Sequence, residues 1–519
     1  MKIISYFLMT VCLFIGGTSC TKEFDEINTD KSAIAKITLN EAKYIFAKGQ
    51  STAVITGDIY QVGINLFADL YAQYWANATT YFSTDRFFIN TSWIDQVFPS
   101  YYTDPATSFT AIFENTDPNS AEYALANVMW VYLFHNVTDQ YGPIPYFQVS
   151  EALESVPYDA QDKIYDDFFK RLDAVNKVLK TKSGQVPFGN FDLIYAGDLN
   201  KWIMFANSLR LRLALRISKV DPARAKVEAE AAVAAGVFLN SPDDDALIKR
   251  TTDDYNYNNH LSTMSEWGEF GMSASMESFL KGYGDPRMPI LFSPTKNSVI
   301  NGTPEYHGIR NGLLATDFND STNKLANNSI AGPRWNLNVN AQANSTSQNV
   351  MSTAEAYFLR AEGALNGWNM GGNAKELYEA GITNSFKQWG VDPSVTNGYL
   401  NNSATPVALN DYLNSPAVSN IPVKFSLTEA IQREQIGTQK WIAMFPDGFA
   451  GWAENRRTGF PKLYPVPNSV NPDIPAGGIV RRLPFAQYEY TTNKKGVEIG
   501  LTLLGGPDNA ATRVWWDKN

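Results

Sequence analysis

The chain has 519 residues, with 53 acidic and 43 basic side chains and a net charge of −10. This acidity argues against a nucleic-acid partner, because the phosphate backbone attracts basic surfaces. Aromatic residues make up 13% of the chain, which favours surfaces that stack flat ligands or pack a partner.

Residues 1–19 have the features of an export signal that ends at Cys20. One basic residue precedes a mostly apolar stretch, and small residues precede the cysteine. The stretch is too short to span a bilayer, and small residues fit the narrow groove of a signal peptidase. A cysteine after such a cut can carry two acyl chains, which anchor a protein stably. We therefore predict a lipidated Cys20; an ordinary secreted protein is the alternative.

Apolar side chains at helical spacing predict a mainly α-helical fold with few short strands. The helices are separated by long loops, and the strongest stripes lie in the first half of the chain. The predicted helices are two within 39–81, one each at 121–136, 164–179, 201–218, 222–235, 353–363 and 374–389, and one at 427–444.

Two predicted helices have small residues at the spacing of a tetratricopeptide second helix. Small side chains there let the two helices of a hairpin approach closely and stack on the next hairpin. The residues with the hairpin spacing are Ala374, Tyr378 and Gly381, and Ala225, Ala229 and Ala232.

Two segments, 243–349 and 391–425, are rich in Asn, Ser, Thr, Gly and Pro, and we expect long functional loops there.

The sequence contains few candidate catalytic residues. Cys12 and Cys20 are the only cysteines, so the chain after residue 20 has no thiol for a disulfide, a metal cluster or a nucleophile. Its three histidines lie far apart, and no nucleophile elbow or phosphate-binding loop occurs. We predict that the protein is not an enzyme and that it binds neither a cofactor nor a metal. Two alternatives stay open: a glycosidase pair among the many carboxylates, and a calcium site at Asp243, Asp244 and Asp245.

Several segments, all in one order, resemble the SusD/RagB-type nutrient-binding lipoproteins. The polar start at 22–26 resembles the mark that sends such lipoproteins to the outer face of the outer membrane. The resemblance covers 20–519 and implies a single domain, with tetratricopeptide-like helical hairpins and a loop-rich ligand-binding half. The matching segments are 138–148 (TDQYGPIPYFQ), 158–174, 197–218, 284–287, 354–364, 439–445, 456–461 and 515–517.

The resemblance also implies a function. Members of this family bind oligosaccharides or oligopeptides at the cell surface and deliver them, as a lid, to a SusC-like TonB-dependent transporter. Two other hypotheses remain: a surface hydrolase of the same nutrient and a structural lipoprotein that binds no ligand.

Aromatic side chains occur together with amides in several loop segments. Sugars bind to this combination because a ring stacks on their C–H face while amides bond the hydroxyls; a peptide would use backbone donors and acceptors instead. The sequence favours neither ligand class. The predicted ligand-binding residues are Trp75, Tyr81, Trp93, Tyr255, Tyr257, Asn258, Trp267 and Trp335.

Overall fold

The computed structural model describes residues 37–55, 57, 59–151 and 153–518. The predicted export signal at 1–19 and the predicted lipidation site Cys20 lie outside the described residues. Within them, no helix has the length and apolar character needed to cross a membrane.

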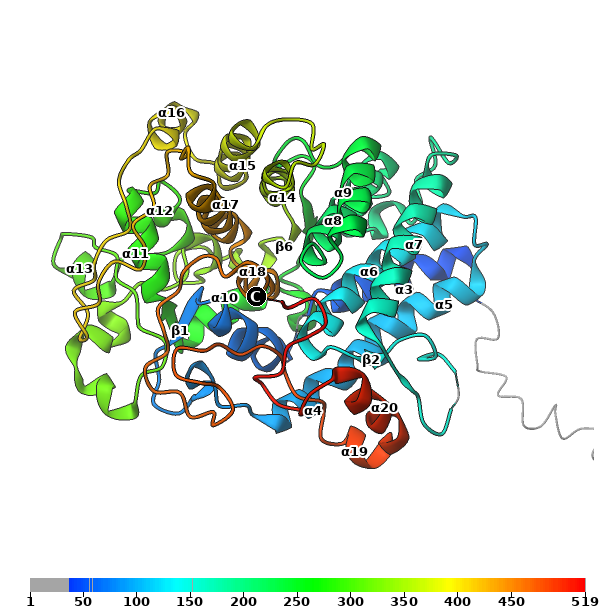
Figure 1. Cartoon of the computed structure of the whole chain (residues 1–519), viewed down its shortest axis with the longest axis horizontal. Coiled ribbons are helices and arrows are strands. Elements are labelled where there is room, and N and C mark those ends of the chain that lie inside the picture. Colours follow the sequence, from blue (N-terminus) through cyan, green and yellow to red (C-terminus); the bar gives the residue numbers. More distant parts are fainter. Residues whose placement is uncertain (1–36, 56, 58, 152, 519) are drawn as a thin grey trace, which may run out of the picture.

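Stacked helical hairpins form the central and right-hand part of the molecule in Figure 1, and we call these hairpins the helical scaffold. This confirms the prediction of a mainly helical fold with tetratricopeptide-like hairpins. The pairs are α6 (Ala121–Tyr141) with α7 (Gln161–Leu179), α8 (Leu199–Arg216) with α9 (Pro222–Ala235), α14 (Thr353–Leu365) with α15 (Ala374–Trp389), and α17 (Glu429–Met444) with α18 (Gly448–Thr458).

Local sequence signals explain where these helices begin and end. The Asp198 carboxylate caps α8 by accepting from two backbone N–H groups, and Pro222 occupies the first turn of α9. Asn373 and Glu376 form a capping box at the start of α15, and Gly390 ends that helix in the left-handed conformation, with φ of +70°. The α9 and α15 bounds are the ones that the sequence predicts.

Small residues set the spacing within the hairpins. A Cβ atom on Gly381 would lie 2.8 Å from the ring of Phe358, so α15 approaches α14 at a position that holds no side chain. The alanines predicted to line the α9 contact, Ala225, Ala229 and Ala232, are all fully buried.

Buried ion pairs join the hairpins to one another. Arg212 of α8 bonds Glu355 of α14 through two nitrogens at 2.7 Å each. Glu454 of α18 is shared by Arg216, Lys440 and Arg457, all of them buried. Because an unpaired buried charge is costly, each cation needs these carboxylates.

The chain before the first hairpin folds into α3 (Leu39–Ala53), the π-helix η2 (Gln61–Asp69), α4 (Thr91–Tyr101), the π-turn η4 (Tyr102–Ala106) and α5 (Thr107–Asn115). Two helices within 39–81 are confirmed as α3 and η2, whereas α4 and α5 were not predicted. Near the other end of the chain, α19 (Glu489–Thr492) and α20 (Lys494–Leu504) pack against each other at the lower edge of the molecule in Figure 1.

Segments 243–349 and 391–425, here called the insertion half, contain more regular structure than the predicted loops. Their helices are short, so they give no periodic pattern of apolar residues from which the sequence could predict them. The elements are β4 (Ala246–Ile248), η6 (Tyr255–Tyr257), α10 (His260–Trp267), β5 (Phe270–Met272), α11 (Ala274–Tyr283), α12 (Met288–Leu291), α13 (Lys296–Ile300), η10 (Pro333–Trp335), β6 (Gln348–Met351, ending just past 349) and α16 (Thr396–Leu400).

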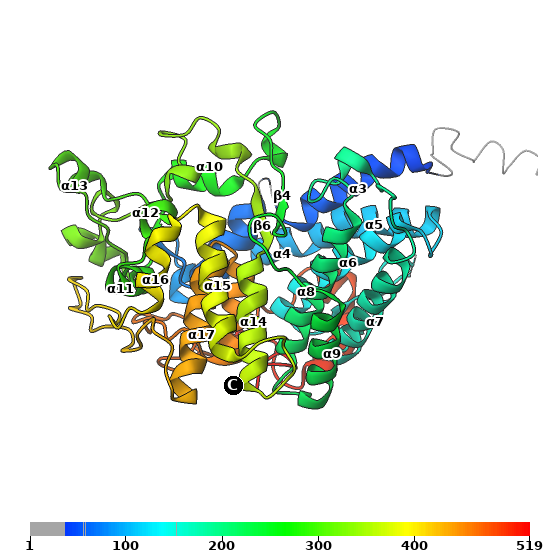
Figure 2. The same cartoon turned by 90° about the horizontal axis from the view of Figure 1, so that it is seen from above.

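The strands form three small antiparallel pairs: β1 (Trp75–Asn77) with β5, β2 (Ile144–Pro145) with β3 (Tyr158–Asp159), and β4 with β6. Figure 2 shows α10, α13 and β4 along one side of the molecule, while the ends of α9, α14 and α17 lie on the opposite side. The pairing of β1 with β5 attaches the insertion half to the N-terminal segment.

Two hydrogen bonds connect this attachment point to Trp441 of the scaffold. The Tyr74 hydroxyl donates to the Trp441 carbonyl at 2.7 Å, and the Trp441 indole N–H donates to the Ala72 carbonyl at 2.9 Å. Their rings stack with centroids 5.2 Å apart, and both side chains are buried.

Candidate functional site

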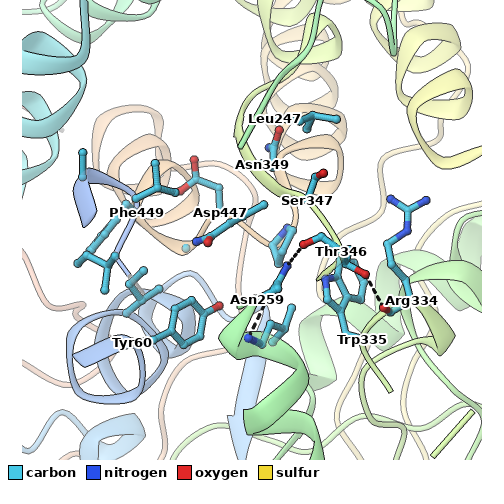
Figure 3. A pocket seen from close by; sticks show the side chains of 18 of the residues that line it. Tyr60, Leu247, Asn259, Arg334, Trp335, Thr346, Ser347, Asn349, Asp447 and Phe449 are labelled. Carbon is cyan, nitrogen blue, oxygen red and sulfur yellow. Dashed lines mark hydrogen bonds between the residues drawn. The ribbon is translucent and has the colours of Figure 1, made fainter. Parts of the chain in front are cut away.

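A pocket of about 310 Å³, open to solvent beside Arg334 and Ser347, lies where α3, η2, α10, residues 334–349, the end of α15 and the connection from α17 to α18 meet (Figure 3). Its volume is near the lower end of the range for small-molecule sites, roughly 300–1,000 Å³, and its mixture of rings and a few polar groups is typical of them. Its aromatic lining residues are Tyr60, Tyr132, Trp335, Trp389 and Phe449; its polar ones include Asn136, Asn259, Arg334, Gln348, Asn349, Gln388 and Asp447.

One wall of the pocket is fixed by hydrogen bonds around Asn259. Its side-chain nitrogen donates to the Thr346 carbonyl at 2.9 Å, while its side-chain oxygen accepts from the Leu261 backbone N–H and caps α10. The Thr346 hydroxyl donates to the Arg334 carbonyl at 2.8 Å (Figure 3). This wall is therefore held in place without a ligand.

The opposite side of the pocket carries the carboxylate of Asp447. Its oxygen accepts from the Ala450 backbone N–H at 3.1 Å, at the start of α18. Burial raises the pKa of Asp447 to about 6, although the charge of Arg212 acts in the opposite direction. Next along the chain, a Cβ atom on Gly448 would lie 2.2 Å from an Asp69 oxygen, so glycine is required for this contact.

Asp69 lies beneath the pocket and is fully buried. Burial raises its pKa to about 8, even though Asn65 donates a hydrogen bond to it. Around neutral pH this carboxyl therefore keeps its proton, and the region below the pocket has less negative charge than its sequence suggests.

Three of the predicted ligand-binding residues, Tyr81, Tyr255 and Trp267, are exposed, and we call them the aromatic face. Their exposed fractions are 64%, 44% and 49%, respectively. The Tyr81 hydroxyl and the Gln61 side chain both donate to the Glu269 carboxylate at 2.6 Å, just after α10.

Tyr255 and Trp267 flank α10 at its two ends. The Tyr255 ring meets His260 edge-on at 4.7 Å, next to Asn259 of the pocket wall, while Trp267 ends the helix. The aromatic face thus lies beside the pocket, around α10 and the start of η2.

The prediction that Trp75 binds ligand is wrong. Its side chain is only 2% exposed, and its ring packs against Phe292 and Phe445 with centroids 5.4 Å away in each case. A ring enclosed in this way has no face for a ligand, so its role is in the core. Trp335 is equally buried, but it lines the pocket.

The remaining predicted residues lie near the site without forming its surface. Trp93 is half-buried and packs edge-on against Phe67 and Phe82. Tyr257 is half-buried in η6, and Asn258 is buried beside Asn259. Their contribution to binding remains a prediction.

Sequence reasoning missed several pocket residues, above all Tyr60, Trp389 and Asp447. They come from three separate helical regions, so no local pattern groups them. The nearest signal is the Phe-Pro-Asp-Gly run at 445–448, a turn-forming sequence at the end of a predicted helix.

The acidic run considered as a calcium site is used by the chain itself. Asp244 accepts from the backbone N–H groups of Leu239 and Asn240. Asp245 accepts from the Ser241 hydroxyl and from the Thr353 backbone N–H at the start of α14. These bonds explain the two buried carboxylates: they shape the turn after α9 and hold it against the start of α14.

Comparison with known proteins gives one consistent result. The model of the SusD-like family, described as Susd and RagB outer membrane lipoprotein, matches residues 23–517. A solved chitin-binding SusD homologue from Flavobacterium johnsoniae is 37% identical, with a TM-score of 0.83 over 92% of this chain and 99% of that one.

SusD homologues from two Bacteroides species are also similar in structure. The one from Bacteroides thetaiotaomicron is 30% identical with a TM-score of 0.81, covering 93% of this chain and 100% of its own. The one from Bacteroides vulgatus is 31% identical with a TM-score of 0.82, covering 92% and 98%. Among curated proteins, none matches the sequence.

Proposed function

The chain belongs to the SusD-like family of outer-membrane lipoproteins, and we propose that it captures oligosaccharides at the cell surface without altering them. The observation that carries this proposal is the aromatic face of Tyr81, Tyr255 and Trp267 beside a preformed pocket. Exposed rings next to hydrogen-bonding side chains suit the C–H faces and hydroxyl rims of sugars.

Two solved relatives favour a glycan over a peptide. The Flavobacterium johnsoniae homologue is described as chitin-binding, and so is a second structural relative that is 28% identical with a TM-score of 0.75. An oligosaccharide is therefore the ligand class that we propose first, with an oligopeptide as the alternative.

The pocket also supports a binding role over hydrolysis. Asp447 is its one acidic side chain among the lining residues that the structure describes, whereas glycoside hydrolysis generally needs a pair of carboxyl groups. We therefore propose that the ligand leaves unaltered.

Delivery and anchoring complete the proposal. We infer that lipid on Cys20 holds the protein to the outer membrane and that a SusC-like TonB-dependent transporter receives the ligand. The family description as outer-membrane lipoproteins supports the anchor; co-purification of this protein with a TonB-dependent outer-membrane transporter would test the transporter.

Calorimetry with glycan and peptide pools tests the ligand class. We expect Tyr81→Ala and Trp267→Ala each to weaken oligosaccharide binding about fivefold, because each removes a stacking ring. The matched control is Phe147→Ala, an equally exposed ring after β2 in the scaffold, which should leave affinity unchanged. Binding of peptides alone would overturn the glycan assignment, and release of new reducing ends would favour the hydrolase.

A further inference from the structure

We propose that the pocket binds a carboxylate through the guanidinium of Arg334, so that the protein prefers oligosaccharides carrying uronic acids over neutral ones. This inference rests on the proposed function as an oligosaccharide binder. It assigns to the pocket a task different from that of the aromatic face, whose rings stack on neutral and acidic sugars alike. Chitin is uncharged, so an acidic ligand would set this protein apart from the relatives described as chitin-binding.

Arg334 is the one cation among the pocket-lining residues that the structure describes. Its side chain is exposed at the opening of the pocket. Within the described part of the chain, its guanidinium forms neither a hydrogen bond nor an ion pair, and it contacts the ring of Trp389 instead. Arginines elsewhere in the fold, such as Arg212 and Arg287, pair with carboxylates. The donors of Arg334 therefore remain available to a ligand.

The guanidinium of Arg334 is held in place before a ligand arrives. The Arg334 carbonyl accepts from the Thr346 hydroxyl at 2.8 Å, and Pro333 restricts the backbone just before it. The guanidinium lies 4.8 Å from the centre of the Trp389 ring, within the range of cation–π attraction. Trp335 supports the same ring edge-on at 5.8 Å. A donor fixed in this way loses little conformational freedom on binding, which favours affinity.

A carboxylate is the group that suits this donor. The planar guanidinium can donate two parallel hydrogen bonds to the two oxygens of a carboxylate, and such charge-assisted bonds are stronger than neutral ones. The exposed Ser347 hydroxyl lies at the same opening and supplies a further donor. A neutral sugar hydroxyl has one oxygen and no charge, so it would use only part of this arrangement. A uronic acid carries the carboxylate at its edge and keeps its C–H faces free for the aromatic face.

The charge that opposes this assignment is that of Asp447, which lines the same pocket on the side opposite Arg334 (Figure 3). Burial raises the pKa of Asp447 to about 6, against the charges of Arg212 and Arg216 on the scaffold side. Its charge is therefore compensated from behind the pocket, whereas Arg334 has no such partner. A ligand with an amine would use Asp447 and a ligand with a carboxylate would use Arg334, so the two charges predict opposite preferences.

A glycan array probed with the purified protein tests the proposal first. The array carries neutral, carboxylated and amine-bearing oligosaccharides in the same linkages, together with peptides that end in a free or an amidated carboxyl group. We expect the strongest binding to the carboxylated oligosaccharides. Equal or stronger binding of the neutral or amine-bearing ones would overturn the preference for acids. Binding of no oligosaccharide, with or without binding of peptides, would instead contradict the proposed function itself.

Calorimetry then measures the effect of the charge. A uronic acid oligomer is compared with its methyl ester, which keeps the sugar and removes the negative charge. We expect the acid to bind about tenfold more tightly, because the ester cannot form the charge-assisted pair. The ratio should shrink as salt is raised, because salt screens the interaction at this open site. Equal affinities of acid and ester at low salt would contradict the proposal.

Variants of Arg334 locate the preference. Arg334→Gln removes the charge, so the acid should bind no better than the ester. Arg334→Lys keeps the charge without the fork, and the ratio should fall only to about threefold. The matched control is Arg433→Gln, near the start of α17, whose other end approaches the pocket; it should leave the ratio unchanged. An undiminished ratio in Arg334→Gln would contradict the assignment.

Asp447→Asn should change the ratio in the opposite direction. An asparagine can still cap the start of α18, whereas the charge that repels a bound carboxylate is lost. At about pH 7.5, above the pKa of about 6, affinity for the acid should rise about twofold while affinity for the ester stays the same. Weaker binding of the acid to this variant would contradict the placement of the carboxylate in the pocket.

Discussion

The helical scaffold and the insertion half are ordered by different means. In the scaffold, long helices such as α8, with 18 residues, are joined by buried ion pairs. In the insertion half, helices such as α10 have 8 residues, and side-chain amides bond nearby carbonyls. Asn328, for example, donates to the Thr322 and Lys324 carbonyls at 2.8 Å each. The scaffold therefore depends on contacts between distant residues, whereas much of the insertion half is held locally, which suits a surface that varies with its ligand.

The scaffold side of this comparison is tested most severely by Glu454→Gln. The change removes the negative charge shared by Arg216, Lys440 and Arg457. We expect the free energy of unfolding to fall by about 3–5 kcal/mol, because buried cations lose their partner. Urea unfolding measures this loss; a change below about 1 kcal/mol would show that the network is not what holds the hairpins together.

Acid should weaken the scaffold through Glu362. Although burial favours its neutral form, Arg457 and Lys440 hold the pKa of Glu362 at about 2, below its ordinary 4.5. A carboxyl group whose pKa is lowered by folding stabilises the folded state at every pH above its ordinary pKa. This stabilisation, roughly 3 kcal/mol, is lost as the pH falls from about 4.5 to about 2. Glu362→Gln should unfold with a shallower acid dependence; an unchanged pH profile would contradict this role.

Asp69, beneath the pocket, should make the free energy of unfolding depend on pH in the opposite direction. Its pKa is raised from 3.8 to about 8, so the folded state holds a proton that the unfolded state releases. Stability therefore falls as pH rises between these values, by up to about 1.4 kcal/mol per pH unit. Asp69→Asn should flatten this slope in unfolding measured between about pH 5 and 7, and parallel curves for both proteins would refute the assignment.

A smaller effect is expected from the local bonds of the insertion half. Asn328→Ala removes the two hydrogen bonds to backbone carbonyls and should cost about 1–2 kcal/mol. We expect faster amide hydrogen exchange confined to residues near 317–329, with the hairpins unaffected. Exchange that spreads into α14 or α17 would show that the two halves unfold together and would weaken the comparison.

Periodicity predicted every scaffold helix except α18, and it was insufficient for the insertion half. The bounds of α9 and α15 follow from apolar spacing and capping residues such as Asn373. Helices of four to ten residues, such as α12 and α11, give too few turns for a stripe. Composition located the loop-rich segments but not the short elements within them.

The ligand-binding residues could likewise be predicted only in part from the sequence. Trp75 and Tyr81 both lie among polar loop residues in the sequence, yet one is buried and the other is exposed. Trp75 is buried because its ring packs against Phe292 and Phe445, which lie more than 200 positions away along the chain. The pocket likewise combines residues from several distant segments, and only the folded chain brings them together.

The hydrogen bonds that Tyr74 and Trp441 donate have a mechanical consequence. Separating the N-terminal segment from the scaffold at this point would strand two buried donors, each at a cost of about 1–3 kcal/mol. If the proposed delivery to a transporter involves a swing of the protein, we expect the N-terminal segment and the scaffold to rotate together, with the pivot outside this junction. Distance probes placed across the junction should report the same separation whether or not sugar is present.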